Sequence, residues 1–393
     1  MTPLRAPAGQ VGQVGEAGPA DTQHRPSASR ARVIWAASAC AVLGGAAIAP
    51  AIPAIEIALG GSTAGVWGRL ALILPAVIVM ATGPWIGRWS GRVDQGRGFV
   101  LSLIALALCG TLGGLVSGFS ALLITRIGLG LAIAASLCFA TAAIANHYNG
   151  AERGQVIGKQ AAINTFGGLA FVLLGGVLAQ WGWRFPFLLY LLALPIAYFA
   201  ARLRWLNQEH PRKAKVALAP LWLDLLTLGG GMAAFYLIPA QAPFLPQLAD
   251  APALTGLVLA GSTFASGVLS LSISSAPLGK ATGLAHWTSA VLVLTGVLGM
   301  TLPLPLWSLF LSAASVGAGF GILLPLTVRR IMQHSTPATA NALSGLIASA
   351  LYAGQVAAAL LALAFGQIRP DLPFWAMAAC LVLGWGIAHH KRI

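Results

Sequence analysis

Few ionisable side chains lie within the apolar stretches of this sequence, and they are the residues that could do chemistry. Arg126 stands inside one stretch, Glu56 closes another and Asp224 stands near the start of a third. An ionisable group at the centre of a bilayer costs roughly 2.5 to 3.5 kcal/mol, so such a group is usually paired, hydrated or functional. We therefore predict that these three side chains bind a substrate or carry protons.

Glu56 and Arg69 stand at the facing ends of two successive stretches, on the side from which the stretch with Arg126 begins. The three side chains would then meet near one end of the molecule. For Glu56 and Arg69 the alternative is an interfacial position, with the charged end of the side chain reaching water.

Two interpretations of Asp224 stay open. Removal from water disfavours the charged form of a carboxyl group, so that such a group can bind and release a proton near neutral pH, which would suit a proton carrier. The carboxylate could equally face lipid headgroups and pair with Lys213 or Lys215, which precede it in a polar segment.

Neutral polar residues within the apolar stretches predict the rest of a polar site. The alternative for each is an ordinary hydrogen bond between membrane helices. Gln241 is the strongest candidate, because neighbouring prolines free backbone carbonyl groups. The set comprises Asn164, Tyr236, Gln241, Asn341, Tyr352 and Gln355.

The elements that must position these residues are twelve hydrophobic segments. Of all residues 58% are hydrophobic and 8% are charged, and the mean hydropathy is +0.82, which excludes an ordinary soluble domain. About 20 apolar residues span a bilayer as a helix, so we predict an all-α membrane protein with twelve transmembrane helices. The segments are 33–55, 67–87, 98–117, 120–146, 161–180, 185–203, 220–243, 253–274, 285–302, 305–328, 340–366 and 371–389.

The net charge of +14 comes from basic residues that fall almost entirely into every second gap between these segments. They form no basic face of the kind that binds nucleic acid, so we expect no nucleic-acid partner. The positive-inside rule instead predicts a multi-pass protein of the cell (inner) membrane with both termini in the cytoplasm. The four cysteines show no paired spacing, so we expect neither a disulfide framework nor a metal site.

The segments divide into two halves that look like repeats. Residues 1–31 predict a disordered cytoplasmic tail, because they are rich in Gly, Pro, Ala, Gln and Ser. A six-helix bundle over 32–203, a cytoplasmic linker over 204–219 and a second bundle over 220–390 follow. The first helix of each half ends in a proline-bearing run, at 49–53 and at 238–246, and such parallel halves are a transporter layout.

The loop after the second segment resembles a signature of the major facilitator superfamily. It reads Gly83-Pro-Trp-Ile-Gly-Arg-Trp-Ser-Gly-Arg92, with Gly87 in place of the family's Asp and Ser90 in place of its second Gly. The resemblance implies two pseudo-symmetric six-helix bundles that alternate access to a central site. It also implies a cytoplasmic gating loop made by Gly83, Arg88, Gly91 and Arg92.

The fourth and fifth segments resemble the superfamily more closely. Arg126 matches the family's fourth-helix arginine, and the run from Gly154 to Tyr190 is similar to efflux-type members. The resemblance implies proton-coupled efflux of a small organic molecule or drug by a monomer. Drug/proton antiporters often carry a Gly-Pro where Phe171 and Val172 stand, so proton-coupled uptake of a small solute is the alternative.

Motifs for other chemistry do not support an enzyme. The sequence holds no Gly-x-x-x-x-Gly-Lys-Ser/Thr, His-Glu-x-x-His or Gly-x-Ser-x-Gly, so we expect no nucleotide hydrolysis and no cofactor. Gly317-Ala-Gly-Phe-Gly321 lies within an apolar segment, where close helix packing explains it. A non-transporting sensor or an intramembrane enzyme is a distant alternative, since it needs a catalytic dyad or a large soluble domain.

Overall fold

A computed structural model describes residues 28–59, 66–90, 93–148, 150–205, 221–275, 282–302, 305–333 and 340–390. The predicted tail, apart from 28–31, and most of the linker 204–219 lie outside these residues. Helix α1 begins at Ala28, within the last residues assigned to the tail.

The described part of the chain is helical throughout and contains no strand. Nine of its helical stretches are long and apolar enough to cross a membrane, and three shorter apolar stretches, Phe185–Ala201, Gly283–Gly299 and Leu372–Gly384, complete the twelve predicted segments. The predicted all-α membrane fold is confirmed. In chain order the elements are α1 (Ala28–Ala46), η1 (Ala49–Ala51), α2 (Ile52–Ala58), α3 (Val66–Ser90), α4 (Gln95–Leu112), α5 (Phe119–His147), α6 (Gly150–Trp181), η2 (Phe185–Leu192), α7 (Ala193–Ala201), α8 (Trp222–Gln241), η3 (Ala242–Phe244), α9 (Pro252–Ser275), α10 (Thr282–Gly299), α11 (Leu306–Gln333), α12 (Ala340–Phe365) and α13 (Leu372–His390).

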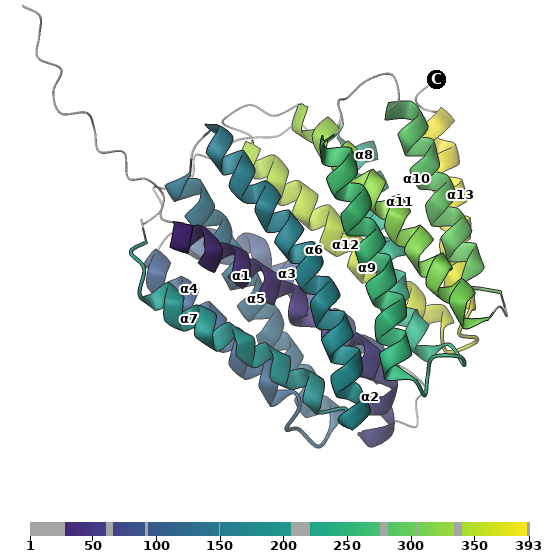
Figure 1. The fold of residues 1–393 in the computed structure, drawn as a ribbon, viewed down its shortest axis with the longest axis horizontal. Helices are drawn as coiled ribbons and strands as arrows, with labels where there is room; N and C mark the ends of the chain where they lie inside the picture. The colour runs from purple at the N-terminus through teal and green to yellow at the C-terminus, as the bar shows by residue number, and fades with distance from the viewer. Residues whose placement is uncertain are drawn as a thin grey trace, which may run out of the picture.

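Two groups of helices lie side by side (Figure 1), one made by α1 to α7 and the other by α8 to α13. Between the groups α6 packs along α9, and α3 packs along α12. Prolines interrupt the regular helix at corresponding places in both groups, because proline lacks the backbone N–H that a helical hydrogen bond needs. Pro50 and Pro53 stand where α1 gives way to η1 and α2, and Pro239 and Pro243 stand where α8 gives way to η3.

Glycine allows α6 and α9 to approach closely. A Cβ atom on Gly176 would lie 2.9 Å from the Pro252 carbonyl oxygen and 3.1 Å from the Gly256 Cα atom. Small residues at such a crossing let helix backbones touch, which is a common basis of helix association in membranes. This contact holds the two groups together along their shared seam.

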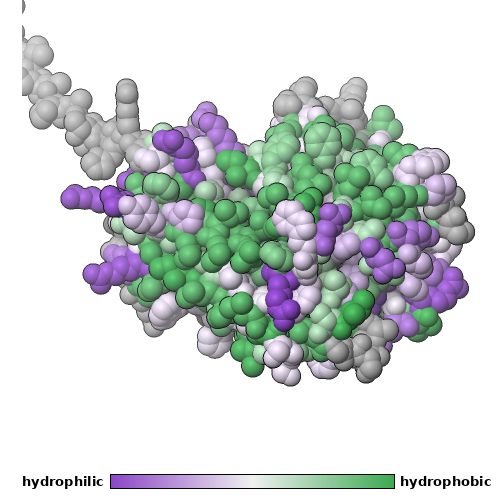
Figure 2. Space-filling model, turned by 60° about the horizontal axis from the view of Figure 1, so that its bottom comes forward, coloured by the Kyte–Doolittle hydropathy of each residue, from purple (hydrophilic) through white to green (hydrophobic). Residues whose placement is uncertain are grey.

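The outer surface is largely apolar. Figure 2 shows hydrophobic side chains over most of the visible face, with hydrophilic side chains gathered in separate patches. Many large apolar side chains are exposed, among them Leu101, Ile124 and Leu284. A surface of this kind is incompatible with water and suits the lipid bilayer.

The buried apolar residues connect the two groups at one end only. We name this end the Gln241 end and the opposite one the Asp224 end, after the residues near the two ends of α8. The largest cluster joins Ile48 and Ile52 of the first group to Leu237 and Ile238 of the second. Toward the Asp224 end, the described residues form two separate clusters, one within each group. The groups therefore meet at the Gln241 end and have independent cores at the other.

Candidate functional site

A cavity of about 340 Å³ lies between the two groups of helices. Its wall is formed by α1, α3, α5 and α6 on one side and by α8, α9, α11 and α12 on the other. The described residues that line it include no Asp, Glu, Lys, Arg or His. Binding sites for small molecules are typically apolar with a few polar groups, and this cavity has that character.

Four of the residues singled out from the sequence line this cavity: Asn164, Tyr236, Tyr352 and Gln355. Tyr352 and Gln355 are three positions apart on α12 and therefore share a helix face. Asn164 shares a face of α6 with Gly168 and Val172, which also line the cavity, by the same spacing. Polar side chains from both helix groups thus lie around one space.

Tyr236 reaches across from the second group to the first. A Cβ atom at Gly45 of α1 would lie 2.6 Å from the Tyr236 hydroxyl oxygen. Glycine at position 45 leaves room for the Tyr236 hydroxyl in this orientation, and a larger residue there would make the hydroxyl shift.

The contribution of α9 was missed by the sequence analysis. Ser262, Thr263 and Ser266 line the cavity together with Leu259, at a spacing that defines one helix face. Ser262 and Thr263 both donate their hydroxyl hydrogen to the Leu259 carbonyl oxygen, at 2.8 and 3.0 Å. The recurrence of small hydroxyl residues three and four positions apart was the signal available in the sequence.

Gln241 does not line the cavity but joins the two groups beyond it, at the Gln241 end. Its Oε1 accepts hydrogen bonds from Nε and Nη2 of Arg69, at 3.1 and 2.9 Å. Its Nε2 donates to the Pro370 carbonyl oxygen at 2.8 Å. Arg69 is 1% exposed, and its guanidinium lies 3.9 Å from the centre of the Phe244 ring. We call Arg69, Gln241 and Pro370 the Gln241 lock.

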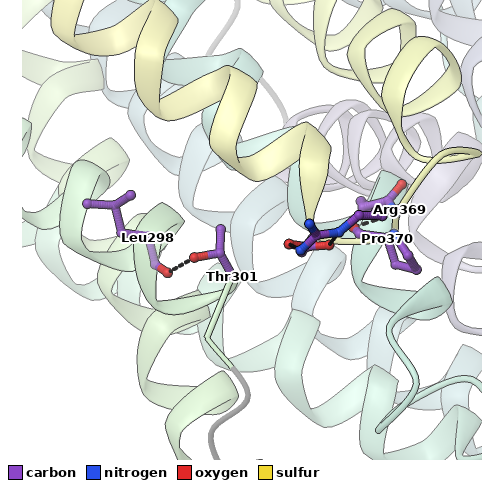
Figure 3. A network of polar contacts seen from close by, with 6 residues as sticks. Leu298, Thr301, Arg369 and Pro370 are labelled. Carbon is purple, nitrogen blue, oxygen red and sulfur yellow. Dashed lines mark hydrogen bonds and ion pairs between the residues drawn. The ribbon is translucent and has the colours of Figure 1, made fainter.

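The turn that supplies Pro370 is held by its own ion pair. Arg369 donates to both carboxylate oxygens of Asp371, at 3.1 and 2.7 Å. Figure 3 shows Arg369 and Pro370 side by side in this turn between α12 and α13, and it also draws the hydrogen bond from Thr301 to the Leu298 carbonyl. The paired carboxylate and guanidinium stabilise the turn, although the pair is partly exposed and each such contact contributes little.

Glu56 lies buried next to the lock. Its Oε1 accepts a hydrogen bond from the backbone N–H of Gly68 at 2.7 Å, in the first turn of α3. A carboxylate at a helix start is stabilised by the free N–H groups and by the helix dipole. The carboxylate also interacts electrostatically with Arg69. The structure therefore brings Glu56 and Arg69 together. Arg126, which the sequence predicted to join them, donates its hydrogen bonds to Tyr190 and Gly110 instead.

Arg126 lies within the first group of helices, outside the described lining of the cavity. It is fully buried, and it donates to the Tyr190 hydroxyl at 3.1 Å and to the Gly110 carbonyl at 3.0 Å. Tyr190 in turn donates to the Leu43 carbonyl at 3.0 Å. This network ties α5 to α4, η2 and α1. The role of Arg126 in a substrate or proton pathway stays a prediction.

Asp224 is buried in the first turn of α8, and its Oδ1 lies 3.7 Å from Nε of Arg330 on α11. The two lysines expected as partners, Lys213 and Lys215, lie outside the described residues. Arg330 is a partner that the sequence analysis did not foresee, because α11 ends far along the chain. The pair joins two helices of the second group at the Asp224 end.

The remaining predicted residues are described only in part. Gly83 lies in α3, and its carbonyl accepts a weak hydrogen bond from the Cys138 thiol at 3.8 Å. Gly91 and Arg92 lie outside the described residues, as do the side chains of Arg88 and Asn341. Within the described ranges no group of three or more His, Cys, Asp and Glu side chains could hold a metal ion.

Comparison with known proteins identifies relatives of this fold. The sequence model of the Major Facilitator Superfamily matches residues 34–359. A bacterial homolog of the human lysosomal transporter Spinster, inward-facing and occupied, is 17% identical with a TM-score of 0.65 over 90% of this chain and 91% of that one. A D-xylose-proton symporter is 13% identical with a TM-score of 0.69 over 91% and 97%. The nucleoside transporter NupG is 12% identical with a TM-score of 0.63 over 91% and 98%. No curated protein matches.

Proposed function

The chain belongs to the Major Facilitator Superfamily, and on that basis we propose that it exports a small organic molecule by alternating access in exchange for protons. One observation carries the proposal, namely a cavity lined by both helix groups and closed at the Gln241 end. A space shared by two groups opens to either side when the groups rock against each other. We propose that the moving groups are residues 32–203 and 220–390, joined by 204–219, within a monomer.

The distribution of charge supports an orientation. The Asp224 end carries Arg202, Arg204, Arg329 and Arg330 at the ends of helices. Because basic residues collect on the cytoplasmic side of a membrane, we propose that this end faces the cytoplasm of a cell (inner) membrane. Both chain termini would then be cytoplasmic, the Gln241 end would face outside, and the structure would correspond to an inward-facing state.

Two buried carboxylates are the candidates for the proposed proton carrier. Glu56 and Asp224 are the buried acidic residues of the described part of the chain, one near each end. A proton that crosses 100 mV supplies about 2.3 kcal/mol from the electrical gradient alone. Movement of one proton inward would therefore help to drive one substrate molecule outward.

Proton-coupled uptake is the second candidate. A D-xylose-proton symporter is among the proteins of similar fold, and Phe171 and Val172 stand where efflux members often carry a Gly-Pro. The likeness, at 13% identity, is one of fold.

Transport into inverted membrane vesicles separates the two directions. An inside-acidic proton gradient is imposed, and labelled sugars, nucleosides and aromatic amides are offered outside. Accumulation that a protonophore abolishes supports efflux, since inverted vesicles take up what cells export. Gradient-driven loss of preloaded compound supports uptake. Vesicles without the protein, and vesicles with the gradient collapsed, serve as controls.

A further inference from the structure

Four polar side chains with amide or phenol groups line the cavity. Asn164 comes from α6, Tyr236 from α8, and Tyr352 and Gln355 from α12. The buried Oδ1 of Asn164 accepts no hydrogen bond. Buried polar groups are nearly always paired, and an unpaired one costs roughly 1 to 3 kcal/mol.

All four side chains are neutral, and they offer both donors and acceptors. Each tyrosine hydroxyl can donate and accept, and each amide carries one carbonyl oxygen and one NH₂ group. The described lining contains no charged side chain that could balance an ionic ligand. Transfer of an ion from water into such a space costs free energy. A neutral ligand group with its own donor and acceptor can instead form hydrogen bonds with these side chains.

The remainder of the wall is apolar and partly aromatic. Phe235 of α8 and Phe320 of α11 both line the cavity, and their rings stack with centroids 5.0 Å apart. Val42 and Leu72 add aliphatic surface from the first group. Aromatic side chains present large, rigid apolar faces against which a flat ligand packs.

We propose that the cavity binds uncharged compounds that join an aromatic body to an amide or a similar neutral group with both donor and acceptor. This inference rests on the proposed transport function, because it assigns the substrate class of the same cavity. Asn164, Tyr352 and Gln355 are its specificity-determining residues.

Three matched probes test the proposal by equilibrium binding to the purified full-length chain in lipid nanodiscs. Cinnamamide carries a neutral amide, cinnamate replaces the amide with a carboxylate of similar shape, and propenylbenzene keeps only the apolar body. We expect saturable binding of cinnamamide, with cinnamate and propenylbenzene each at least about 10-fold weaker. Equal or tighter binding of either comparison probe overturns the proposal, and so does the absence of saturable cinnamamide binding.

Substitutions in the cavity wall test whether cinnamamide binds in this cavity. Gln355→Met removes the amide and keeps the length of the side chain, so we expect cinnamamide to bind about 3-fold to 10-fold more weakly. Gln367→Met is the matched control, because Gln367 is exposed in the turn after α12, where it donates to the Leu363 carbonyl. Tyr352→Phe, with Tyr198→Phe as its exposed control, tests the hydroxyl separately. Unchanged binding in Gln355→Met and Tyr352→Phe overturns the proposal.

Binding and transport can fail independently. If cinnamamide binds but no compound moves in proton-loaded vesicles, the inference holds and the proposed function fails. If gradient-driven transport is found for an ionic compound that competes with cinnamamide, the function holds and the inference fails.

Discussion

Arg69 of α3 donates two hydrogen bonds to a single oxygen, Oε1 of Gln241 on α8, at 3.1 and 2.9 Å. The contact joins the two helix groups at the end where the apolar core is continuous. Hydrogen bonds from a charged donor contribute about 1.5 to 3 kcal/mol when buried. This pair is therefore a principal polar contribution to closure of the Gln241 end.

We expect Gln241→Leu to open that end, because the substitution leaves the buried Arg69 guanidinium without its acceptor. A cysteine at Thr263 in the cavity should then react at least ~10-fold faster with an impermeant maleimide added from the Gln241 side. The background for labelling replaces the four native cysteines, Cys40, Cys109, Cys138 and Cys380, by alanine.

Two further variants check this result. Gln241→Glu places a carboxylate against Arg69 and should slow labelling, because an opposite charge strengthens the contact. Gln367→Leu makes the same change at an exposed glutamine and should leave the rate as it was. Equal labelling rates in Gln241→Leu and the parent protein would show that the lock does not hold the end closed.

The two buried carboxylates should differ in proton coupling. Glu56 lies at the closed end beside Arg69, so its surroundings change when the lock opens. Asp224 pairs with Arg330, whose side chain is 38% exposed, at the opposite end. We expect Glu56→Gln to lose proton-driven accumulation but keep substrate exchange without a gradient, and Asp224→Asn to keep both. The reverse pattern would assign the proton to Asp224, and full coupling in both variants would exclude these carboxylates as carriers.

We expect Arg126→Ala to abolish transport and to leave insertion into the membrane intact. The substitution removes hydrogen bonds to Tyr190 and to the Gly110 carbonyl, so the melting temperature in detergent should also fall. Arg126→Lys keeps the positive charge but not the guanidinium geometry, and Tyr190→Phe removes the hydroxyl that accepts the Arg126 hydrogen bond. Transport restored by lysine would indicate that the charge is required, whereas transport by Arg126→Ala at the parent rate removes Arg126 from the mechanism.

Gly317→Ala should destabilise the second group of helices. Its Cβ atom would lie 1.9 Å from the Ser262 carbonyl oxygen of α9, so the helices would have to separate. Overpacking of this kind costs about 1 to 3 kcal/mol. Gly230→Ala is the matched control, since no atom lies within 4 Å of its Cβ position and alanine is the better helix former. A melting temperature that falls equally in both variants would contradict this packing.

The fold could be predicted from the sequence because length and hydropathy alone define a membrane-spanning helix. All twelve predicted segments correspond to apolar helices. The polar residues of α12 and Asn164 could be singled out because polar side chains are rare in such segments. Their convergence on one cavity could not, since it depends on how α6 and α12 are rotated.

Contacts between distant parts of the chain were the least predictable. Gln241 and Arg69 are 172 positions apart, and neither composition nor spacing pairs them. One interpretation of Asp224 paired it with lysines close in sequence, which lie outside the described residues, and an arginine of α11 lies near it in the structure. Arg126 was grouped with Glu56 and Arg69 because all three stand toward the same side, yet its hydrogen-bond partners are Tyr190 of η2 and Gly110 of α4.

The three separate clusters of buried apolar residues imply that the molecule does not unfold in one step. Residues that share a core exchange their amide hydrogens as a unit, and units with smaller cores open first. The small cluster around Leu228 and Ile331 should take up deuterium earliest, independently of the cluster around Phe99 and Phe139. Amides near Ile52 and Ile238 should be protected longest. The Gln241 end should therefore stay folded at temperatures where the other end has already opened, and one melting temperature does not describe both ends.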